Sequence, residues 1–238
     1  MQTYIIVPTY NEAENLPHLL KEIFALPVDV NVINVDDGSP DCTGDIAEEW
    51  AAAHPNRMRV VHRSGKLGLG TAYLAGFRRA FELGAEAVLT MDADFSHNPR
   101  YIPAMLARAE TADLVIGSRY VPGGDMLYCP WYRKVLSGGA NLVAHFALGL
   151  EARDTTAGFR LYRRQVLESI DLNGIFSSGY SFLIEMLYLV QRQGWRVAEV
   201  PIVYEDRMAG QTKISRAEIM RALYTVLRLS GRRFIMRR

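Results

Sequence analysis

The sequence predicts an α/β protein built on a mostly parallel central sheet with helices on both faces. Apolar stretches of strand length alternate with amphipathic stretches of helix length over the first 120 residues. Several of the strand stretches run directly into acidic or other polar residues. Such alternation is typical of parallel strands joined by crossover helices. In open sheets of this kind, ligands bind beyond the carboxyl ends of the strands.

The expected elements follow a regular order up to residue 119. Strands are expected over 3–8, 30–37, 57–63, a stretch ending at Asp92, and 113–119. Helices are expected over 12–25, 43–53 and 71–83, and from Pro99 onward. Thr43 is expected to cap the second helix. The first helix carries its apolar residues on one side, namely Leu16, Leu19, Leu20 and Ile23.

The second half of the chain is less regular. A partly apolar helix is expected over 130–150, and a strand running into a turn over 156–164. Residues 180–194 are apolar nearly all round, so we expect a core helix there. Pro201 favours an edge position for the strand expected over 195–206. A helix that alternates apolar and arginine residues is expected over 215–233.

Composition excludes some classes of protein. The formal net charge of +1 argues against a general nucleic-acid binder. The charge is uneven, because residues 1–62 hold ten acidic and three basic residues, whereas 205–238 hold nine basic and three acidic ones. A basic C-terminal segment indicates either an anionic surface or substrate nearby, or a solvated helix face.

The same sequence gives expectations about location. Cys42 and Cys129 form no CxxC pair, so a reduced, cytosolic chain is expected. The first residues, MQTYIIVPTYNE, have no basic region and enter a strand directly, so no signal peptide is expected. No apolar run reaches the ~20 residues of a membrane span.

Two carboxylates, Asp92 and Asp94, follow the fourth expected strand with only Ala93 between them. Like charges this close repel, and burying either without a partner is costly. A divalent cation would neutralise the pair, and Mg²⁺ commonly binds through one or two carboxylates plus substrate phosphates. The alternative is a strand-end Asp followed by a cap for the helix near Pro99. The acids of the neighbouring VDDGSPD segment favour the metal.

Asp37 in VDDGSPDCTGD is a candidate ligand-binding residue. A carboxylate only accepts hydrogen bonds, and ribose hydroxyls and base edges donate them. Turn formation is the alternative, since Asp, Gly, Ser and Pro all form turns. We expect both, with Gly38 and Pro40 shaping the turn and Asp37 reaching the ligand.

Two loops and the histidines carry weaker signals. SGKLGLGTAY has the order GxxGxG, not GxGxxG, and no Lys-Ser/Thr closes it, so a tight turn opening a helix is favoured over a dinucleotide or P-loop site. Arg207 and Lys213 flank an Ala-Gly-Gln turn and could clamp a diphosphate, although an ordinary exposed loop is the alternative. The five histidines show no metal-binding spacing, and His97 beside Asp94 suits helix entry as well as chemistry.

Eight segments in this order resemble the family 2 glycosyltransferases of the GT-A fold, and among them the dolichol-phosphate (polyprenyl-phosphate) mannose synthases without a transmembrane domain. The segments are IVPTYNEAENLP, VDDGSPDCTGD, RSGKLGLGTAY, MDADFSHNP, VIGSRYVPGG, DTTAGFRLYRR, GYSFLIEM and EVPIVYEDRMAGQTKIS. The resemblance implies one GT-A domain over 1–238, with a Rossmann-like nucleotide-sugar half (1–120), an acceptor half (121–214) and a basic amphipathic helix (215–238).

The resemblance also implies roles for individual residues. Donor contacts fall on Pro8, Tyr10, Glu12, Val35, Asp37, Asp92, Ala93, Asp94, Arg119, Arg207 and Lys213. Metal ligation falls on Asp92 and Asp94, and catalysis on Asp94, Arg119, Arg207 and Lys213. The acceptor phosphate would meet Arg119, Arg133 and Ser137. Ser96 departs from the glutamine that relatives often carry, which leaves sugar contacts there unassigned.

The implied reaction moves mannose from GDP-mannose to a dolichyl or polyprenyl monophosphate, with inversion and with Mg²⁺ or Mn²⁺ as the cofactor. UDP-glucose as donor is the close alternative, and a non-catalytic nucleotide-sugar binder is the alternative from another class. The expected location is cytoplasmic and peripheral to a membrane, with Leu223, Val226, Leu227 and Ile235 of the basic tail at the interface. A separate membrane-anchoring subunit is a further expected partner, and no nucleic acid is expected.

Overall fold

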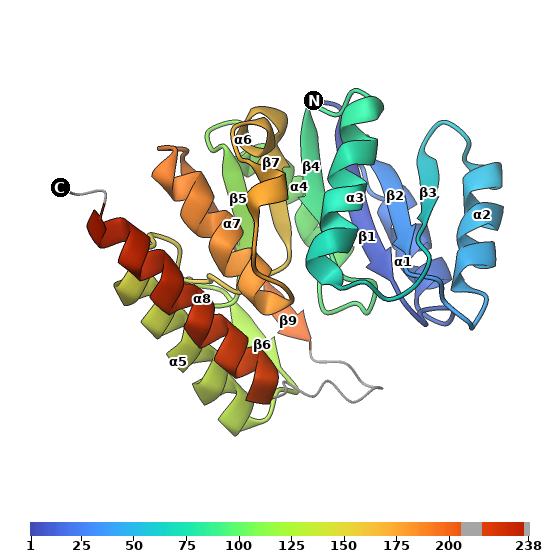
Figure 1. The fold of residues 1–238 in the computed structure, drawn as a ribbon. Helices are drawn as coiled ribbons and strands as arrows, with labels where there is room; N and C mark the ends of the chain where they lie inside the picture. Colours follow the sequence, from blue (N-terminus) through green and yellow to red (C-terminus); the bar gives the residue numbers. More distant parts are fainter. Residues whose placement is uncertain (206–215, 236–238) are drawn as a thin grey trace.

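The computed structural model describes residues 1–205 and 216–235 of the 238-residue chain. Arg207 and Lys213, predicted to clamp a diphosphate, therefore lie outside the described residues. Within the described part, the chain folds into a central sheet between two layers of helices, as Figure 1 shows.

The central sheet has seven strands in the order β3-β2-β1-β4-β7-β5-β8. Its strands are β1 (Thr3–Thr9), β2 (Asn31–Asp36), β3 (Met58–His62), β4 (Ala87–Thr90), β5 (Leu114–Ser118), β7 (Arg160–Arg163) and β8 (Val197–Pro201). All neighbours pair in parallel except β7, which is antiparallel to both β4 and β5. A separate parallel pair joins β6 (Asp125–Leu127) and β9 (Val203–Glu205). The mostly parallel sheet predicted from the sequence is confirmed.

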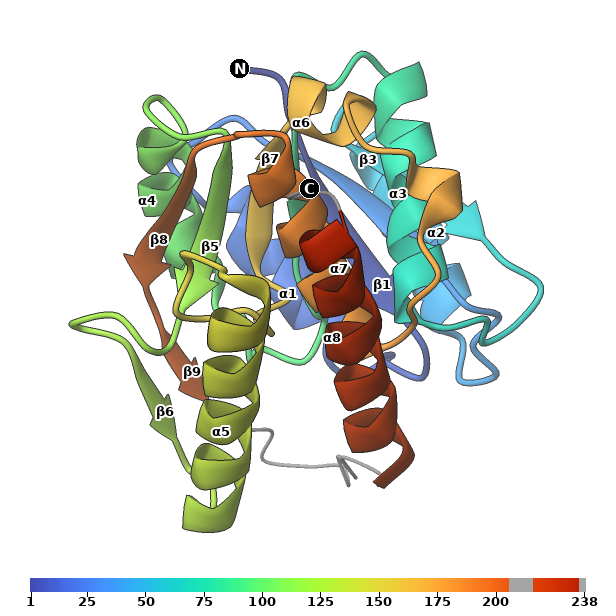
Figure 2. The same cartoon turned by 60° about the vertical axis from the view of Figure 1, so that its left-hand side comes forward.

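Helices cover both faces of the sheet, as the two views in Figures 1 and 2 show. One face carries α3 (Leu69–Glu82), α6 (Arg164–Glu168) and α7 (Tyr180–Arg192). The other carries α1 (Leu16–Phe24), α2 (Thr43–Ala53) and α4 (Ile102–Arg108). Beyond α7 lie α5 (Trp131–Leu148) and α8 (Arg216–Ile235), and short 3₁₀ turns form η1 (Pro99–Tyr101) and η2 (Leu172–Gly174).

Two hydrophobic cores result, one on each face. In β1, Ile6 packs in the core beneath α3 and α7, whereas Ile5 and Val7 pack in the core beneath α1 and α4. Strands buried on both faces read as continuous apolar runs, which explains TYIIVP. Gly76 lets α3 lie directly on β1, because a Cβ there would stand only 2.5 Å from Cγ2 of Ile6.

Several expectations about single elements are confirmed and others are wrong. The core helix (α7) is almost entirely buried, and β8 is an edge strand ending at Pro201. Helix α1 begins at Leu16, four residues later than predicted. Thr43 is not a cap, because Cys42 occupies that position with a φ of 67° and Asp41 accepts a hydrogen bond from the Thr43 backbone N–H.

Candidate active site

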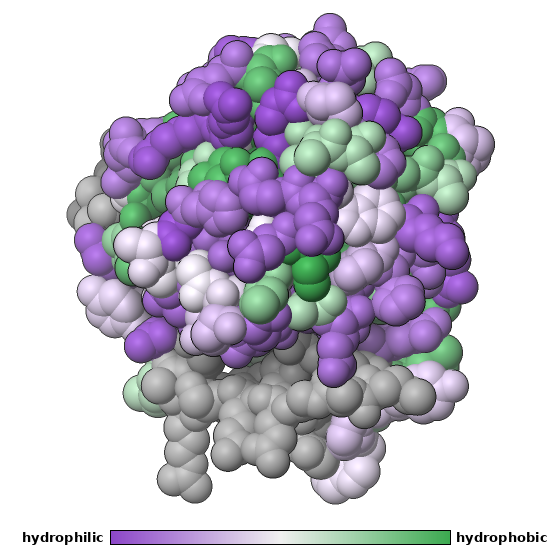
Figure 3. Space-filling model, turned by 90° about the vertical axis from the view of Figure 1, so that its right-hand side faces the viewer, coloured by the Kyte–Doolittle hydropathy of each residue, from purple (hydrophilic) through white to green (hydrophobic). Residues whose placement is uncertain are grey.

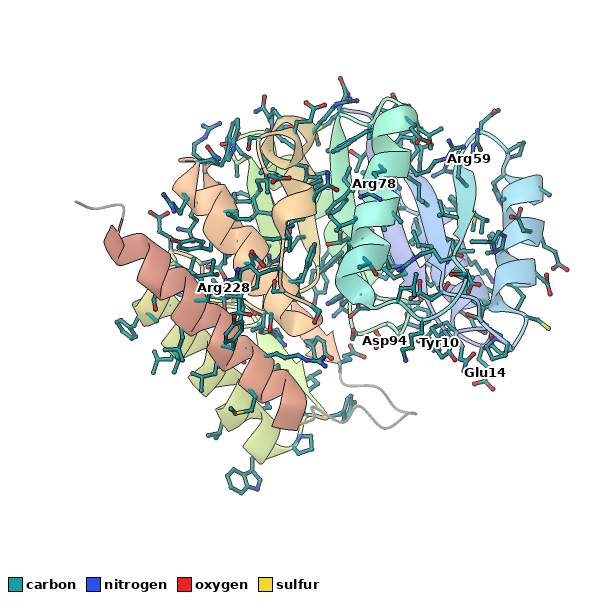
Figure 4. The ribbon with its side chains drawn as sticks, viewed as in Figure 1. Tyr10, Glu14, Arg59, Arg78, Asp94 and Arg228 are labelled. Atoms are coloured by element: carbon teal, nitrogen blue, oxygen red, sulfur yellow. The ribbon has the colours of Figure 1, made fainter. Side chains whose placement is uncertain are left out.

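The carboxyl ends of β1, β2, β4 and β5 deliver polar residues to one edge of the sheet. Because these strands run in parallel, the residues that follow them reach the same edge. Figure 4 shows Tyr10, after β1, and Asp94, after β4, along that edge. Strand β7 is antiparallel, so the loop before it reaches the same edge from the other direction.

Asp94 is held by the residue two positions later. Its Oδ1 accepts hydrogen bonds from the Ser96 backbone N–H (3.1 Å) and from the Ser96 hydroxyl (2.6 Å). The intervening Phe95 has a φ of 62°, which closes this tight turn. A charge-assisted bond of this length fixes the carboxylate strongly. Sequence reasoning treated Ser96 only as a departure from glutamine and missed this role.

Asp92 is held from its backbone and from its side chain. The Tyr73 hydroxyl donates to Oδ1 of Asp92 (3.3 Å), and the Asp92 backbone N–H donates to Nδ1 of His97 (2.9 Å). Burial and the charge of Asp92 raise the pKa of Tyr73 well above its usual range, so the hydroxyl remains a donor. Nδ1 of His97 thus serves as the hydrogen-bond acceptor for the Asp92 backbone. His97 also stacks on Phe159 (5.2 Å between centroids) and supports Asp92.

The donor set at this edge suits a divalent cation carried by one or two carboxylates. Asp92 and Asp94 are both partly exposed, and Ala93 between them is buried. Among residues 1–205 and 216–235, no three His, Cys, Asp or Glu side chains gather into a metal cluster. Two carboxylates without a third protein ligand match the way Mg²⁺ binds together with substrate phosphates.

The two acids after β2 have different environments. Asp36 shapes the turn, since its carboxylate accepts from the Gly38 and Ser39 N–H groups (both 3.1 Å) and from the hydroxyls of Ser39 and Thr9. Gly38 itself has a φ of 68° and lies against the backbone of residues 63–65. The turn predicted there therefore depends on Asp36 and Gly38, and Asp37 is left for another role.

Asp37 pairs with Arg63, a residue that sequence reasoning missed. Nη1 of Arg63 donates to Oδ1 of Asp37 (2.7 Å), and Nη2 donates to the Thr71 hydroxyl (2.6 Å). Both charged side chains are buried, with 9% and 8% of their area exposed. Burial raises the pKa of Asp37, although the Arg63 guanidinium lowers it in part. A carboxyl group with a shifted pKa beside a charged partner at a strand end is common at functional sites.

The remaining predicted donor residues lie on β1, just after it, or on β2, and differ in their contacts. The Lys66 ammonium lies 4.5 Å from the centroid of the Tyr10 ring, so the glycine-rich loop meets the end of β1. Oε2 of Glu12 accepts from the Asn15 amide (2.8 Å). Pro8 lies beside Val35 in the ladder of β1 and β2. The Val35 side chain is fully buried in the core, so only its backbone could approach a nucleotide.

Arg119, after β5, forms a buried ion pair with Asp154. Nε and Nη2 of Arg119 each lie 2.7 Å from a different carboxylate oxygen, and Nη2 also donates to the Thr156 hydroxyl (2.9 Å). Burial alone would raise the pKa of Asp154, but Arg119 outweighs it and holds that pKa below its usual range. Among the described residues, no acceptor faces the two N–H groups of Nη1.

The other predicted acceptor residues lie on α5. Ser137 accepts a hydrogen bond from the Tyr120 hydroxyl (2.8 Å), which ties α5 to the residue next to Arg119. Arg133 lies on the same helix, two turns before Asn141, but its side chain is outside the described part of the structure. The structure thus brings Tyr10, Asp37, Asp92, Asp94 and Arg119 to one edge of the sheet, and assigns no contact to Arg133, Arg207 or Lys213.

A mostly parallel sheet flanked by helices, with polar side chains after β1 and β2 and paired acids after β4, is the arrangement expected of an α/β glycosyltransferase of the GT-A type. Residues 4–171 match the family described as Glycosyl transferase family 2. The chain belongs to this family and is a glycosyltransferase.

Two curated relatives are similar over nearly the whole chain. Polyprenol monophosphomannose synthase of Mycolicibacterium smegmatis is 46% identical over 226 residues, covering 94% of this chain and 85% of the relative. Undecaprenyl-phosphate mannosyltransferase of Micrococcus luteus is 45% identical over 228 residues, covering 96% of this chain and 93% of the relative.

Solved structures share the fold at lower identity. Glucosyl-3-phosphoglycerate synthase of Mycobacterium tuberculosis, in complex with Mn²⁺, UDP and glucosyl-3-phosphoglycerate, has a TM-score of 0.68 at 23% identity, covering 97% of this chain and 80% of that one. A mannosyltransferase of Pyrobaculum calidifontis, in complex with GDP-Man and Mn²⁺, has a TM-score of 0.65 at 19% identity, covering 95% and 64% of the chains. These likenesses confirm the predicted GT-A fold.

Proposed function

We propose that this glycosyltransferase transfers mannose from GDP-mannose to a polyprenyl monophosphate, releasing GDP and inverting the anomeric centre. The observation that supports this most strongly is the 45–46% identity, over at least 94% of this chain, to relatives named for polyprenyl-phosphate mannosyl transfer. The paired carboxylates Asp92 and Asp94 at the sheet edge give the proposal its chemistry.

The nucleophile needs no strong base from the protein. A phosphate monoester is mostly ionised near neutral pH, because its second pKa is about 6. His97 beside Asp92 has a structural contact instead, since its Nδ1 accepts a hydrogen bond from the Asp92 backbone N–H. The protein's task is therefore to position both substrates and to stabilise the departing diphosphate.

The described residues divide this task between two sides of the edge. Asp92 and Asp94 would hold Mg²⁺ or Mn²⁺, which when bound neutralises charge on the donor diphosphate. Asp37 and Tyr10 would hold the nucleoside, with the carboxylate of Asp37 accepting from ribose or base. Arg119 would offer Nη1 to phosphate while Asp154 holds the rest of its guanidinium. Arg133 and Ser137 remain proposed acceptor contacts, and Arg207 and Lys213 proposed contacts of the leaving diphosphate.

The sugar donor is the first point to test. Purified protein is mixed with polyprenyl phosphate, Mg²⁺ or Mn²⁺, and GDP-mannose, UDP-glucose or UDP-N-acetylglucosamine, and nucleotide release and lipid product are measured. We expect GDP release and a mannosyl lipid only with GDP-mannose. A glucosyl lipid formed from UDP-glucose would show that UDP-glucose is the donor. Binding of a nucleotide sugar with no nucleotide released from any of the three donors would indicate a non-catalytic binder.

We also propose that the protein docks peripherally on the cytosolic face of a membrane through α5 and α8. No described helix is long and apolar enough to cross a membrane. Yet these two helices expose large apolar side chains, hereafter the α5–α8 surface: Trp131, Val135, Leu142, Val143, Phe146, Met220, Leu223, Tyr224 and Leu227. The side over α2 is by contrast largely hydrophilic, as Figure 3 shows. An apolar patch of this kind marks a membrane or protein contact.

The details of the tail differ from the sequence-based prediction. Val226 is buried against the domain (5% exposed), so its predicted place at the interface is wrong. Leu223 and Leu227 are exposed as predicted. Arg228 lies over the Phe176 ring, 4.0 Å from its centroid, and so helps to seat α8 on the domain. A membrane-anchoring partner subunit remains a proposal.

Vesicle flotation tests the membrane proposal. Phe146→Glu and Leu227→Glu place charges on the α5–α8 surface and should reduce binding to anionic vesicles, while mannosyl transfer in detergent continues. Binding unchanged by both substitutions would contradict the proposal, and neutral vesicles measure how much the basic residues contribute.

A further inference from the structure

The loop that precedes β7, residues 154–159 (hereafter the bridging loop), touches both sides of the candidate site. It enters the sheet between β4, which leads to Asp92, and β5, which leads to Arg119. Only an antiparallel strand could bring its preceding loop to the edge where its parallel neighbours end. Arg160, the first residue of β7, stands opposite Thr90 of β4 and Ile116 of β5.

One end of the bridging loop holds the Arg119 side. Asp154 and Thr156 accept three hydrogen bonds from the Arg119 guanidinium. The next contact reaches α5, because the Thr155 backbone N–H and hydroxyl both donate to Oδ1 of Asn141 (2.7 Å each). This end therefore sets where Arg119 and the helix that bears Ser137 lie.

The other end of the bridging loop packs against the Asp92 side. A Cβ at Gly158 would stand 3.3 Å from Cε1 of His97, 3.5 Å from the Tyr73 hydroxyl and 3.9 Å from Oδ1 of Asp92. Phe159 stacks on His97, the residue that accepts the Asp92 backbone N–H. The chain thus passes from the partner of Arg119 to the supports of Asp92 within six residues.

Arg160 fixes the bridging loop from behind. It is fully buried, and its guanidinium donates to the backbone carbonyls of Thr155 (2.8 Å), Ala157 (2.7 Å) and Leu183 (2.7 Å), and more weakly to the Tyr162 hydroxyl (3.4 Å). All four acceptors are neutral oxygens. Burying a charge on neutral acceptors is costly, so a purely structural site would be better served by an apolar residue. The planar fork of Arg, however, spans three carbonyls that no other side chain could reach together.

We propose that the bridging loop holds the Asp92 side and the Arg119 side of the site at a fixed separation, and that Arg160 is the positioning residue that locks this loop. The positive charge of Arg160 also helps to keep Asp154 ionised. The identity of the two substrates rests on the proposed function, but the positioning role does not. In-line transfer needs the two phosphates at a defined distance, and a small displacement is expensive in rate.

The test compares Arg160→Met and Arg160→Lys with the wild type. One measurement is the Kd of GDP, and of UDP, in the presence of Mn²⁺, by calorimetry. Another is the nuclear magnetic resonance signal of the Arg119 Nε–H, assigned with Arg119→Lys. A third is the KM for polyprenyl phosphate. We expect Arg160→Met to weaken Mn²⁺-dependent nucleotide binding about tenfold, as loss of an outer-shell support does, to shift the Arg119 signal and to raise the KM. Arg160→Lys should fall between, because one ammonium cannot span three carbonyls.

Arg163 supplies the matched control. It lies on the same strand and also donates to backbone carbonyls, those of Ala109 and Glu110, but at the far end of β7. Arg163→Met should cost stability and leave all three measurements unchanged. If Arg160→Met behaves like Arg163→Met, the positioning role is wrong.

Two milder substitutions keep the proposal testable if Arg160→Met does not fold. Gly158→Ala should weaken Mn²⁺-dependent nucleotide binding and leave the Arg119 signal in place, whereas Thr156→Val should move the Arg119 signal and raise the KM for polyprenyl phosphate. If Gly158→Ala leaves nucleotide binding unchanged and Thr156→Val leaves the Arg119 signal unchanged, the inference is wrong. If the wild-type protein binds Mn²⁺ and nucleotide but transfers no mannose, only the proposed function is wrong. The binding and resonance measurements would still test the positioning role of Arg160.

Discussion

Replacing Arg63 by Met should expose the energetic cost of keeping Asp37 charged. The substitution leaves the Asp37 carboxylate, 8% exposed, without its 2.7 Å partner. Removing one member of a buried ion pair costs about 3–5 kcal/mol. Asp37 still receives a backbone hydrogen bond from Leu67, so we expect the lower end of that range. At about 2–4 °C per kcal/mol for a domain of this size, the Tm should fall by roughly 6–12 °C.

A thermodynamic cycle separates the charge effect from lost packing. Asp37→Asn keeps an oxygen that can accept from Arg63, so it should destabilise less than Arg63→Met. Combining the two removes the unpaired charge, and the double variant should be more stable than the sum of the single effects predicts, by about 1–3 kcal/mol. Arg59→Met is the control, because Arg59 lies on β3, which ends just before Arg63, and its hydrogen-bond acceptors among the described residues are the carbonyls of Pro55 and Met58.

The same variant should change how donor binding depends on pH. Burial already raises the pKa of Asp37, and without Arg63 that pKa rises further. A binding mode that needs the ionised carboxylate is then lost at a higher pH as the solution is acidified. Calorimetric titrations of GDP-mannose with Mn²⁺ across pH 5 to 8 check this. The coupling between Arg63 and Asp37 would be refuted if the two substitutions change the free energy of unfolding additively and if GDP-mannose binding by Arg63→Met depends on pH as it does in the wild type.

Three further predictions follow from individual contacts. Gly76→Ala should destabilise by about 1–3 kcal/mol, because the added Cβ meets Ile6 at 2.5 Å; a Tm equal to that of the wild type would show that α3 can shift away. Although burial alone would raise it, the pKa of Asp154 is held below its usual range by the Arg119 guanidinium. Its contribution to stability is therefore fully present above the ordinary carboxyl pKa of about 3.9 and is lost progressively as the pH falls from there through the depressed pKa. The Tm gap between wild type and Asp154→Asn should narrow from pH 7 to pH 3, and a constant gap would contradict this. Ser96→Ala removes the 2.6 Å bond to Asp94 and should weaken Mn²⁺-dependent nucleotide binding about tenfold in calorimetry. Unchanged affinity would contradict this role of the hydroxyl.

The layered α/β fold could be predicted because its signals are local. The apolar run TYIIVP and the helix over 16–24, with apolar residues on one side, each indicate which of their faces are buried from a few consecutive residues. Where the prediction was wrong, a longer-range contact decided. Thr43 satisfies the cap pattern, yet its hydroxyl accepts a hydrogen bond from the Glu12 backbone N–H, 31 residues away, while its own N–H donates to the nearby Asp41 carboxylate. The strand expected over 156–164 begins only at Arg160, and the residues before it form a loop whose carbonyls at Thr155 and Ala157 accept hydrogen bonds from the Arg160 guanidinium.

The candidate site was predictable in its acids and not in their partners. Asp37, Asp92 and Asp94 each follow a strand, and that position alone indicates the binding edge. Their supports come from remote parts of the chain: Arg63 is 26 residues from Asp37 and Asp154 is 35 from Arg119. No spacing rule links such pairs, since the fold alone brings them together. The motif DTTAGFR contained both Asp154 and Arg160, but nothing in it distinguished an ion-pair partner from a turn residue.

Titration of GDP-mannose into wild type and Asp94→Asn, with and without Mn²⁺, tests the central claim most directly. The claim is that Asp92 and Asp94 carry the cation that binds the donor diphosphate. Wild type should bind GDP-mannose far more tightly with Mn²⁺ than without it. Asp94→Asn should keep the wild-type Tm, because this strand-end side chain is partly exposed and adds little to the core, yet it should lose the Mn²⁺-dependent affinity and the mannosyl transfer. Metal-dependent affinity of wild-type strength in a folded Asp94→Asn protein would contradict the account.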